Sequence, residues 1–197
     1  MHPPRRKGHF VPALSFGPSV VGSLRNAFKD VFFDVHFMVD YPEKFVEPLA
    51  QCAHGSKPGL LGFTFHVEAT QPRGLTESTI AAIRKAGMRV GLALSPDTPI
   101  DAVLPFAAAV DMVLVMTVRP GLGGQSFMAD QLAKVERLRR DFPLLNIQVD
   151  GGIKPGDSIK KAAAAGANYI VSGSGVYMAK DPKAAIDEMR AAVLEVL

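Results

Sequence analysis

Residues 146–152 read Asn-Ile-Gln-Val-Asp-Gly-Gly, and this stretch decides how the rest of the chain is interpreted. Polar and apolar residues alternate from Asn146 to Asp150, which predicts a strand with Ile147 and Val149 on one face. The two glycines that follow allow a sharp turn and a close approach to a ligand. Asp150 is therefore expected at the carboxyl end of a strand, where parallel α/β folds bind their ligands.

A helix and a second strand are expected next, over about 156–165 and 167–172, with Gly166 ending the helix. The second strand runs into Gly173-Ser174-Gly175, whose free N–H groups suit a phosphate but which is also ordinary loop sequence. Asp150 likewise has two interpretations: a turn-forming residue, or an acid/base or metal ligand. The two turns together favour a phosphorylated substrate.

Composition narrows the class of protein. The chain has 197 residues, 48% of them hydrophobic, and a net charge of +3, which fits one globular domain over residues 1–197. Its longest apolar runs are too short for a membrane span, and no secretory signal is expected. No basic stripe is interleaved with aromatic residues, so nucleic-acid binding is not supported. The single cysteine, Cys52, fits a reducing compartment.

Strands and helices are expected to alternate along the chain, which predicts a parallel α/β sheet. Strands are expected at 31–39, 63–68, 88–94, 111–117, 146–150 and 167–172. Helices are expected at 18–29, 41–53, 75–86, 98–109, 128–140, 156–165 and 182–197. No dinucleotide fingerprint follows a strand, so a barrel is preferred, although a closed (β/α)8 barrel needs two more strands than these.

Several side chains near the strand ends have both a structural and a functional interpretation. His36 is either a core histidine or, with Asp150, part of a divalent metal site. His66 with Glu68 is interpreted as a structural hydrogen bond, and Met38 and Met116 as core residues. The glycine-rich loop 121–124 either surrounds a phosphate or is a mobile surface loop.

The ordered set of these segments resembles the ribulose-phosphate 3-epimerase family, whose members are TIM-type (β/α)8 barrels. The resembling segments are 8–12, 33–39, 65–69, 116–125, 149–152 and 171–174. The resemblance implies interconversion of D-ribulose 5-phosphate and D-xylulose 5-phosphate, in the pentose phosphate and Calvin pathways. Two aspartates exchange the C3 proton on opposite faces, and a divalent metal (Zn, Fe, Mn or Co) stabilises the enediolate.

Roles carry over residue by residue. Asp150 matches one catalytic aspartate that is also a metal ligand, and His36 matches a metal ligand that also touches substrate. The other substrate and phosphate contacts implied are Gly121, Leu122, Gly123, Gly124, Gly151, Gly152, Gly173 and Ser174. Met38 and Met116 match methionines that line the pocket around the enediolate.

The sequence also departs from the family pattern. The family carries a strand with a substrate-binding Ser, and then His-x-Asp-x-Met-Asp-Gly, before His-Phe-Val-Pro; here residues 1–8 read Met-His-Pro-Pro-Arg-Arg-Lys-Gly. The second catalytic aspartate and one histidine ligand have no counterpart, so little or no epimerase activity is expected. Ala13 and Leu122 replace the usual Asn and Phe, and residues 54–61 resemble an insertion. Both larger departures resemble errors of a gene model.

Rival functions remain open at this point. A noncatalytic phosphosugar-binding or subunit-interaction protein is the main alternative, and another phosphate-binding barrel enzyme is a weaker one. The resemblance implies a cytoplasmic homo-oligomer, with a dimer expected, and a plastid location stays open. Unpaired edges on the strands at 31–39 and 167–172 predict poor solubility or dependence on oligomer contacts.

Overall fold

The structure, a computed structural model, describes residues 10–11, 16–52, 59–121 and 125–196. Its six strands follow sequence order in one sheet, β1-β2-β3-β4-β5-β6. Helices alternate with the strands, which confirms the α/β fold of the TIM-barrel type. The chain divides into two compact units, Met1–Leu92 and Ala93–Leu197.

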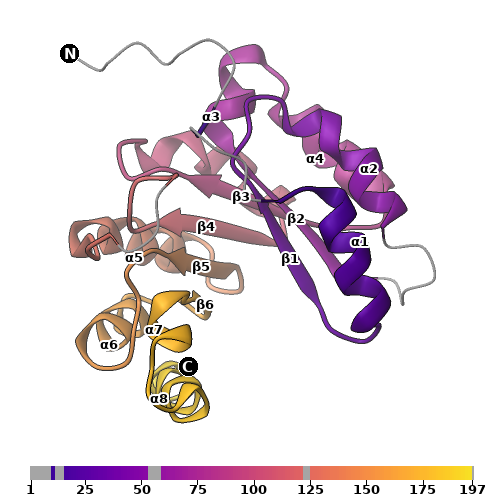
Figure 1. Ribbon diagram of the computed structural model, residues 1–197. Helices are drawn as coiled ribbons and strands as arrows, with labels where there is room; N and C mark the ends of the chain where they lie inside the picture. Colours follow the sequence, from indigo (N-terminus) through magenta and orange to yellow (C-terminus); the bar gives the residue numbers. More distant parts are fainter. Residues whose placement is uncertain (1–9, 12–15, 53–58, 122–124, 197) are drawn as a thin grey trace. The chain divides into compact units, whose positions relative to one another are not determined.

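The first unit holds the elements from α1 to β3, and β3 runs across the division into the second unit. They are α1 (Pro18–Ala27), β1 (Phe33–Phe37), η1 (Pro42–Phe45), α2 (Val46–Gln51), β2 (Leu61–His66), α3 (Val67–Thr70), η2 (Gln71–Arg73), α4 (Thr76–Lys85) and β3 (Arg89–Leu94). Strands β1 and β2 pair in parallel with Phe33 opposite Leu61 and Phe37 opposite Phe65. Every residue of β2 is buried, and α1, α2 and α4 cover one face of β1 and β2 (Figure 1).

Aromatic side chains fill the layer between these helices and strands. The ring of Phe37 stacks on that of Phe63, with centroids 4.7 Å apart, and lies 5.2 Å from that of Phe45. Phe63 and Phe65 have no exposed surface. Burying side chains of this size contributes about 1.5–3 kcal/mol each, so this layer is a main source of the first unit's stability.

A buried arginine fixes the connection from α1 into β1. The guanidinium of Arg25 donates to the carbonyl oxygens of Val31 at 2.7 Å and Leu60 at 2.8 Å, and lies 4.1 Å from the ring centre of Phe33. Arg25 is only 3% exposed. The planar fork thus links the backbone on both sides of the start of β1 and β2, and the oxygen of Leu60 also accepts from the N–H of Phe33 at 3.0 Å.

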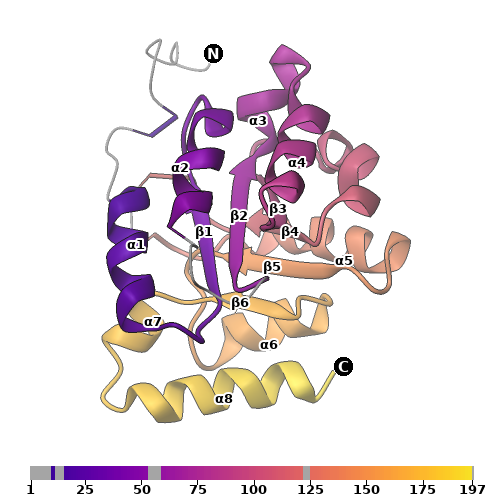
Figure 2. The same cartoon turned by 90° about the vertical axis from the view of Figure 1, so that its right-hand side faces the viewer.

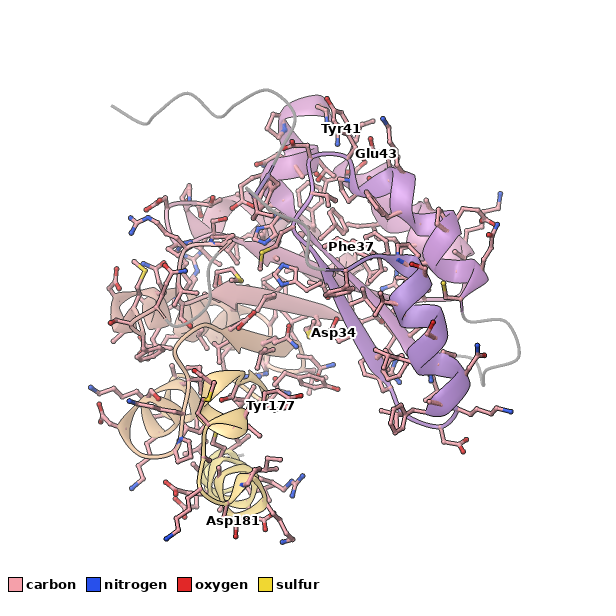
Figure 3. All side chains as sticks on the ribbon, in the orientation of Figure 1. Asp34, Phe37, Tyr41, Glu43, Tyr177 and Asp181 are labelled. Carbon is pink, nitrogen blue, oxygen red and sulfur yellow. The ribbon has the colours of Figure 1, made fainter. Side chains whose placement is uncertain are left out.

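Arg73 ties the segment after β1 to the segment after β2. Its guanidinium donates to the backbone oxygens of Asp40 at 3.0 Å and Ala69 at 2.8 Å. It also makes a bidentate pair with Glu43, at 2.7 and 3.0 Å. Figure 3 shows Glu43 beside Tyr41 beyond the carboxyl end of β1. The hydrogen bond to Arg73 is the main cause that lowers the pKa of Glu43.

The Glu43 pair predicts a small acid-dependent loss of stability. Because the folded-state pKa of Glu43 is lowered, its contribution is complete above the ordinary carboxyl pKa and is lost as pH falls through the folded-state pKa. We expect Glu43→Gln to cost about 1 kcal/mol or less at pH 7, and nothing once the Glu43 carboxyl is protonated in both the folded and the unfolded chain. Urea unfolding of both proteins between pH 7 and pH 3 measures this. A difference that grows as pH falls would contradict the prediction.

The second unit holds the elements that follow β3. They are η3 (Ile100–Ala102), η4 (Leu104–Ala109), β4 (Met112–Met116), η5 (Ala129–Gln131), α5 (Leu132–Asp141), β5 (Asn146–Asp150), α6 (Asp157–Ala164), β6 (Tyr169–Val171), α7 (Ser174–Tyr177) and α8 (Pro182–Leu194). Strands β4, β5 and β6 pair in parallel, with Met116 opposite Asp150 and Asp150 opposite Val171. All of β4 is buried, and Figure 2 shows α8 running beside α6.

A capping aspartate and a glycine mark two of the helix ends in this unit. The carboxylate of Asp181 accepts from the N–H of Ala184 at 3.0 Å, which caps α8, and Figure 3 shows Asp181 at this end of the helix. Gly166, with φ of 102°, follows the end of α6 as predicted. Arg139 donates to its carbonyl oxygen at 2.8 and 3.0 Å. This arginine joins α5 to the α6–β6 connection.

Several predicted elements differ from the observed ones; the helices predicted at 41–53 and 128–140, for example, each begin with a 3₁₀ segment, η1 and η5. The helix predicted at 98–109 is two 3₁₀ segments, η3 and η4, because Pro105 has no N–H for an α-helical bond. The strand predicted at 63–68 ends at His66, so Glu68 lies on α3. The strand predicted at 31–39 is only Phe33–Phe37, because these are the residues paired with β2.

The ends of the sheet are β1 and β6. Each has one neighbouring strand among the described residues, as expected for the strands at 31–39 and 167–172. All three residues of β6 are partly exposed, whereas β4 is buried throughout. Within the described ranges, none of the helices has the length and apolar character needed to cross a membrane.

Candidate functional site

Two histidines meet at the carboxyl ends of β1 and β2. The Nε2 atoms of His36 and His66 lie 2.9 Å apart, and the rings stack with centroids separated by 4.9 Å. Nδ1 of His66 lies 3.1 Å from Oε2 of Glu68, which confirms the predicted hydrogen bond between these two residues. His66 is fully buried, whereas His36 is half-buried. The three residues form one continuous chain of polar contacts.

The surroundings of His36 keep its imidazole neutral. Burial is the main cause that lowers the pKa of His36 well below its ordinary value of 6.5. The nearby His66 lowers this pKa further, and Glu68 partly offsets both effects. A neutral imidazole is the form that binds a metal or accepts a hydrogen bond.

A second polar contact lies one layer deeper on the same two strands. The hydroxyl of Thr64 donates to Oδ1 of Asp34 at 2.7 Å, and Figure 3 shows Asp34 toward the amino end of β1. Thr64 is fully buried, and an added Cβ on Gly91 would lie 2.1 Å from its hydroxyl oxygen. Nothing in the sequence pattern indicated that Gly91 makes room for Thr64.

Asp150 is held at the end of β5 through the backbone. The N–H of Thr117 donates to the carbonyl oxygen of Asp150 at 2.8 Å. The Thr117 hydroxyl donates to the carbonyl oxygen of Gly151 at 2.7 Å. Thr117 is fully buried. Its role was missed in the sequence, where the only signal was a polar residue directly after a buried apolar strand.

The glycines after Asp150 occupy places where a side chain does not fit. Gly151 has φ of 126°, and an added Cβ would lie 2.5 Å from a methyl group of Val118. Gly152 has φ of 68°, and its Cβ would lie 2.6 Å from the N atom of Phe127. The loop after β4 therefore packs directly against the turn after Asp150. This close packing is what the Asp-Gly-Gly sequence makes possible.

The loop after β4 returns to the strand at Met128, whose N–H donates to the carbonyl oxygen of Thr117 at 2.9 Å. Gly121 adopts a φ of 115°. The predicted contacts Leu122, Gly123 and Gly124 lie outside the described residues. Phosphate binding by this loop stays a prediction.

The turn after β6 is held by Ser172 and opens a short helix. The Ser172 hydroxyl donates to the carbonyl oxygen of Ile153 at 2.7 Å, which links this turn to the one after β5. Gly173 precedes the four-residue helix α7, and both Gly173 and Ser174 are exposed. Their N–H groups lie at a helix start, as the phosphate interpretation requires.

The remaining predicted residues fall in both units. Met116 is the last residue of β4 and only 1% exposed, while Met38 follows β1 and is half-buried. His36 belongs to the first unit and Asp150 to the second. Nitrogen and carboxylate donors of this kind suit Zn, Fe, Mn or Co. Within the described part of the chain, no group of three or more His, Cys, Asp or Glu residues is placed to hold a metal ion.

Comparison with solved structures supports the fold. A 3-hexulose-6-phosphate synthase from Salmonella typhimurium matches with a TM-score of 0.64 and 20% identity, over 91% of this chain and 81% of that one. An orotidine 5'-monophosphate decarboxylase from Sulfolobus solfataricus matches with a TM-score of 0.52 and 13% identity, over 94% of this chain and 96% of that one. At these identities the likeness concerns the fold alone.

Comparison of sequences identifies the family. Residues 1–177 match the model of the ribulose-phosphate 3 epimerase family. A ribulose-phosphate 3-epimerase from Schizosaccharomyces pombe is 45% identical over 188 residues, which are 94% of this chain and 78% of that protein. A ribulose-phosphate 3-epimerase, cytoplasmic isoform, from Oryza sativa is 46% identical over 189 residues, again 94% and 78%. The chain that places Asp150 and its two glycines at the end of β5 therefore belongs to the ribulose-phosphate 3-epimerase family.

Proposed function

We propose that this chain acts on D-ribulose 5-phosphate and D-xylulose 5-phosphate at C3, with Asp150 as the acid/base on one face of the substrate. The observation that carries the proposal is the placement of Asp150 at the carboxyl end of β5, fixed by Thr117 and followed by Gly151 and Gly152. A strand end fixed in this way holds a carboxylate steadily enough for proton transfer. The family of the chain supplies the substrate class.

The proton transfer can be written with every atom accounted for. The Asp150 carboxylate takes the proton from C3, the C–H electron pair forms a C2–C3 double bond, and the C2 carbonyl π pair moves onto its oxygen to give an enediolate. The carboxyl then returns a proton to C3, either the same one or one exchanged with solvent. A divalent metal, with Asp150 as one of its ligands, would stabilise the negative charge on the substrate oxygens.

Inversion at C3 needs a second proton donor on the opposite face. The printed chain has no carboxylate between Met1 and Val11, the stretch where the family pattern carries its partner aspartate. The histidines at 2 and 9 are the only side chains there that titrate near neutral pH. We propose that residues 1–197, taken by themselves, remove and return the C3 proton of one epimer faster than they invert C3.

Two measurements on one sample test this expectation. Incorporation of deuterium at C3 in D₂O, followed by NMR, reports proton removal, and a coupled assay with added Zn, Mn, Co or Fe reports inversion. We expect exchange into one epimer with much slower inversion, and faster inversion once a family-type His-x-Asp-x-Met-Asp-Gly segment is added. Equal inversion rates with and without that segment would refute the one-base proposal. If both deuterium exchange and inversion are absent, the noncatalytic alternative is favoured.

We also propose that the chain self-associates, and that it acts in the cytoplasm like its rice relative. Three apolar side chains on and directly after α1 are about half exposed: Val20, Leu24 and Phe28. We expect a dimer by light scattering, and we expect Leu24→Lys to shift the equilibrium toward monomer. Leu144→Lys is the control, because Leu144 is an apolar residue outside α1 that is 98% exposed. A monodisperse monomer at high concentration would exclude the proposed dimer.

A further inference from the structure

Glu68, His66 and His36 make a chain of hydrogen bonds in which the resemblance to the family gives a role to His36 and none to His66 or Glu68. Oε2 of Glu68 lies 3.1 Å from Nδ1 of His66, and Nε2 of His66 lies 2.9 Å from Nε2 of His36. The side chain of His66 has no exposed surface, and that of Glu68 is 10% exposed. All three residues belong to the first unit.

The fold places these groups with little freedom. Strands β1 and β2 pair in parallel with His36 opposite Thr64, so His66 is the next residue of β2 on the same face. Helix α3 begins directly after His66, which brings Glu68 in its first turn back against the ring. The ring of Phe10 lies 4.5 Å from that of His66 and that of His36 lies 4.9 Å away. This packing of rings keeps His66 between Glu68 and His36.

Hydrogen-bond chemistry gives this chain of contacts a direction. A carboxylate can only accept, so Nδ1 of His66 must carry the proton that it shares with Glu68. A neutral imidazole protonated at Nδ1 has its lone pair on Nε2. Nε2 of His36 must then donate to it, since two bare nitrogens at 2.9 Å would repel each other. His36 consequently keeps its own lone pair on Nδ1.

We propose that Glu68 and His66 are positioning residues that hold His36 in the tautomer with a bare Nδ1, so that this nitrogen can bind a divalent cation. Without a carboxylate at one end, two neutral imidazoles can share a proton in either direction. In the reversed direction His36 would present an N–H at Nδ1, which cannot bind a cation. Glu68 favours one direction because its hydrogen bond is charge-assisted. The preferred tautomer does not depend on the proposed function, whereas the binding of a cation at Nδ1 rests on the metal-assisted chemistry proposed above.

The tautomers are measurable in the metal-free chain. Long-range ¹H–¹⁵N correlation spectra distinguish protonated from bare imidazole nitrogens. We expect a bare Nδ1 with a protonated Nε2 in His36, and the reverse in His66. A protonated Nδ1 in His36 would overturn the inference without any variant. Because no substrate or metal is present, this result does not depend on whether the chain is an active epimerase.

A matched pair of variants tests the role of the carboxylate. Glu68→Gln keeps the shape but adds an N–H₂ that can donate to Nδ1 of His66, so both proton directions become available. We expect the Nδ1 resonance of His36 to move toward that of a protonated nitrogen. Glu43→Gln removes a carboxylate that pairs with Arg73 in the same unit, and should leave both imidazoles unchanged. Unchanged tautomers in Glu68→Gln would overturn the role of Glu68.

Zn²⁺ titration then tests the consequence for a cation. Loss of such a supporting partner typically weakens metal binding about 10- to 100-fold. We expect a loss of this size in Glu68→Gln by calorimetry and none in Glu43→Gln. The same Zn²⁺ affinity in the unmodified chain and in both variants would overturn the cation role, whatever the catalytic assay shows.

Discussion

Gly91→Ala is expected to destabilise the chain by about 3–5 kcal/mol, which is a large part of the stability of an ordinary domain. The added Cβ would lie 2.1 Å from Oγ1 of Thr64, 2.9 Å from its Cβ and 3.0 Å from its Cγ2. Both residues are buried in paired strands, so neither backbone can easily withdraw. Thr64 would have to turn away and give up its 2.7 Å hydrogen bond to Asp34. Chemical denaturation with urea measures the loss.

Two control variants separate the predicted clash with Thr64 from the general effect of replacing a glycine by alanine. Gly17→Ala adds the same methyl group where nothing lies within 4 Å, and should cost less than about 1 kcal/mol. Thr64→Ala removes Oγ1 and Cγ2, which are two of the three atoms nearest to the new methyl group. The double variant should therefore lose less stability than the sum of the two single variants. Full additivity, or an unchanged midpoint in Gly91→Ala, would contradict the predicted clash.

Much of the fold followed from periodicity and glycine placement. Alternation at 146–150 predicted β5 to the residue, and Gly166 correctly marked the end of α6. Patterns failed where two local structures share one signal. Thr64, His66 and Glu68 fit the two-residue period of a strand, but the chain turns into α3 directly after His66. The alternation cannot report this turn, because a helix that starts after a strand can also bring its second residue back to the same side.

The candidate site was predictable one residue at a time and not as a set of contacts. Sequence reasoning paired His66 with Glu68, which are two residues apart, and the structure confirms the pair. It did not pair His36 with His66, 30 residues away, because that contact depends on the register of β1 against β2. The hydrogen bond from Thr117 to Gly151 joins residues 34 positions apart in the sequence and was missed for the same reason. Local patterns identify candidate residues, whereas strand register decides which of them touch.

The largest effect on chemistry is expected from Asp150→Asn. A general base contributes about 10²- to 10⁴-fold, so C3 exchange in D₂O should fall by at least about 100-fold. The fold should persist, because Thr117 holds residue 150 through its backbone oxygen at 2.8 Å and an amide has the size of a carboxylate. Asp157→Asn is the matched control, since this carboxylate pairs with Lys161 at the surface and is 80% exposed. Equal exchange rates in the two variants would remove Asp150 from the proposed chemistry.

The same variant distinguishes a base from a residue that only holds a metal. A carboxylate that serves solely as a ligand weakens cation binding when it is replaced, and saturating Zn²⁺ or Mn²⁺ then restores the rate. A carboxylate that takes the C3 proton cannot be replaced in this way, because an amide has no lone pair basic enough to accept that proton. We therefore expect the exchange rate of Asp150→Asn to stay low at every metal concentration. Recovery to the rate of the unmodified chain would assign Asp150 to the metal alone and leave proton removal to another group.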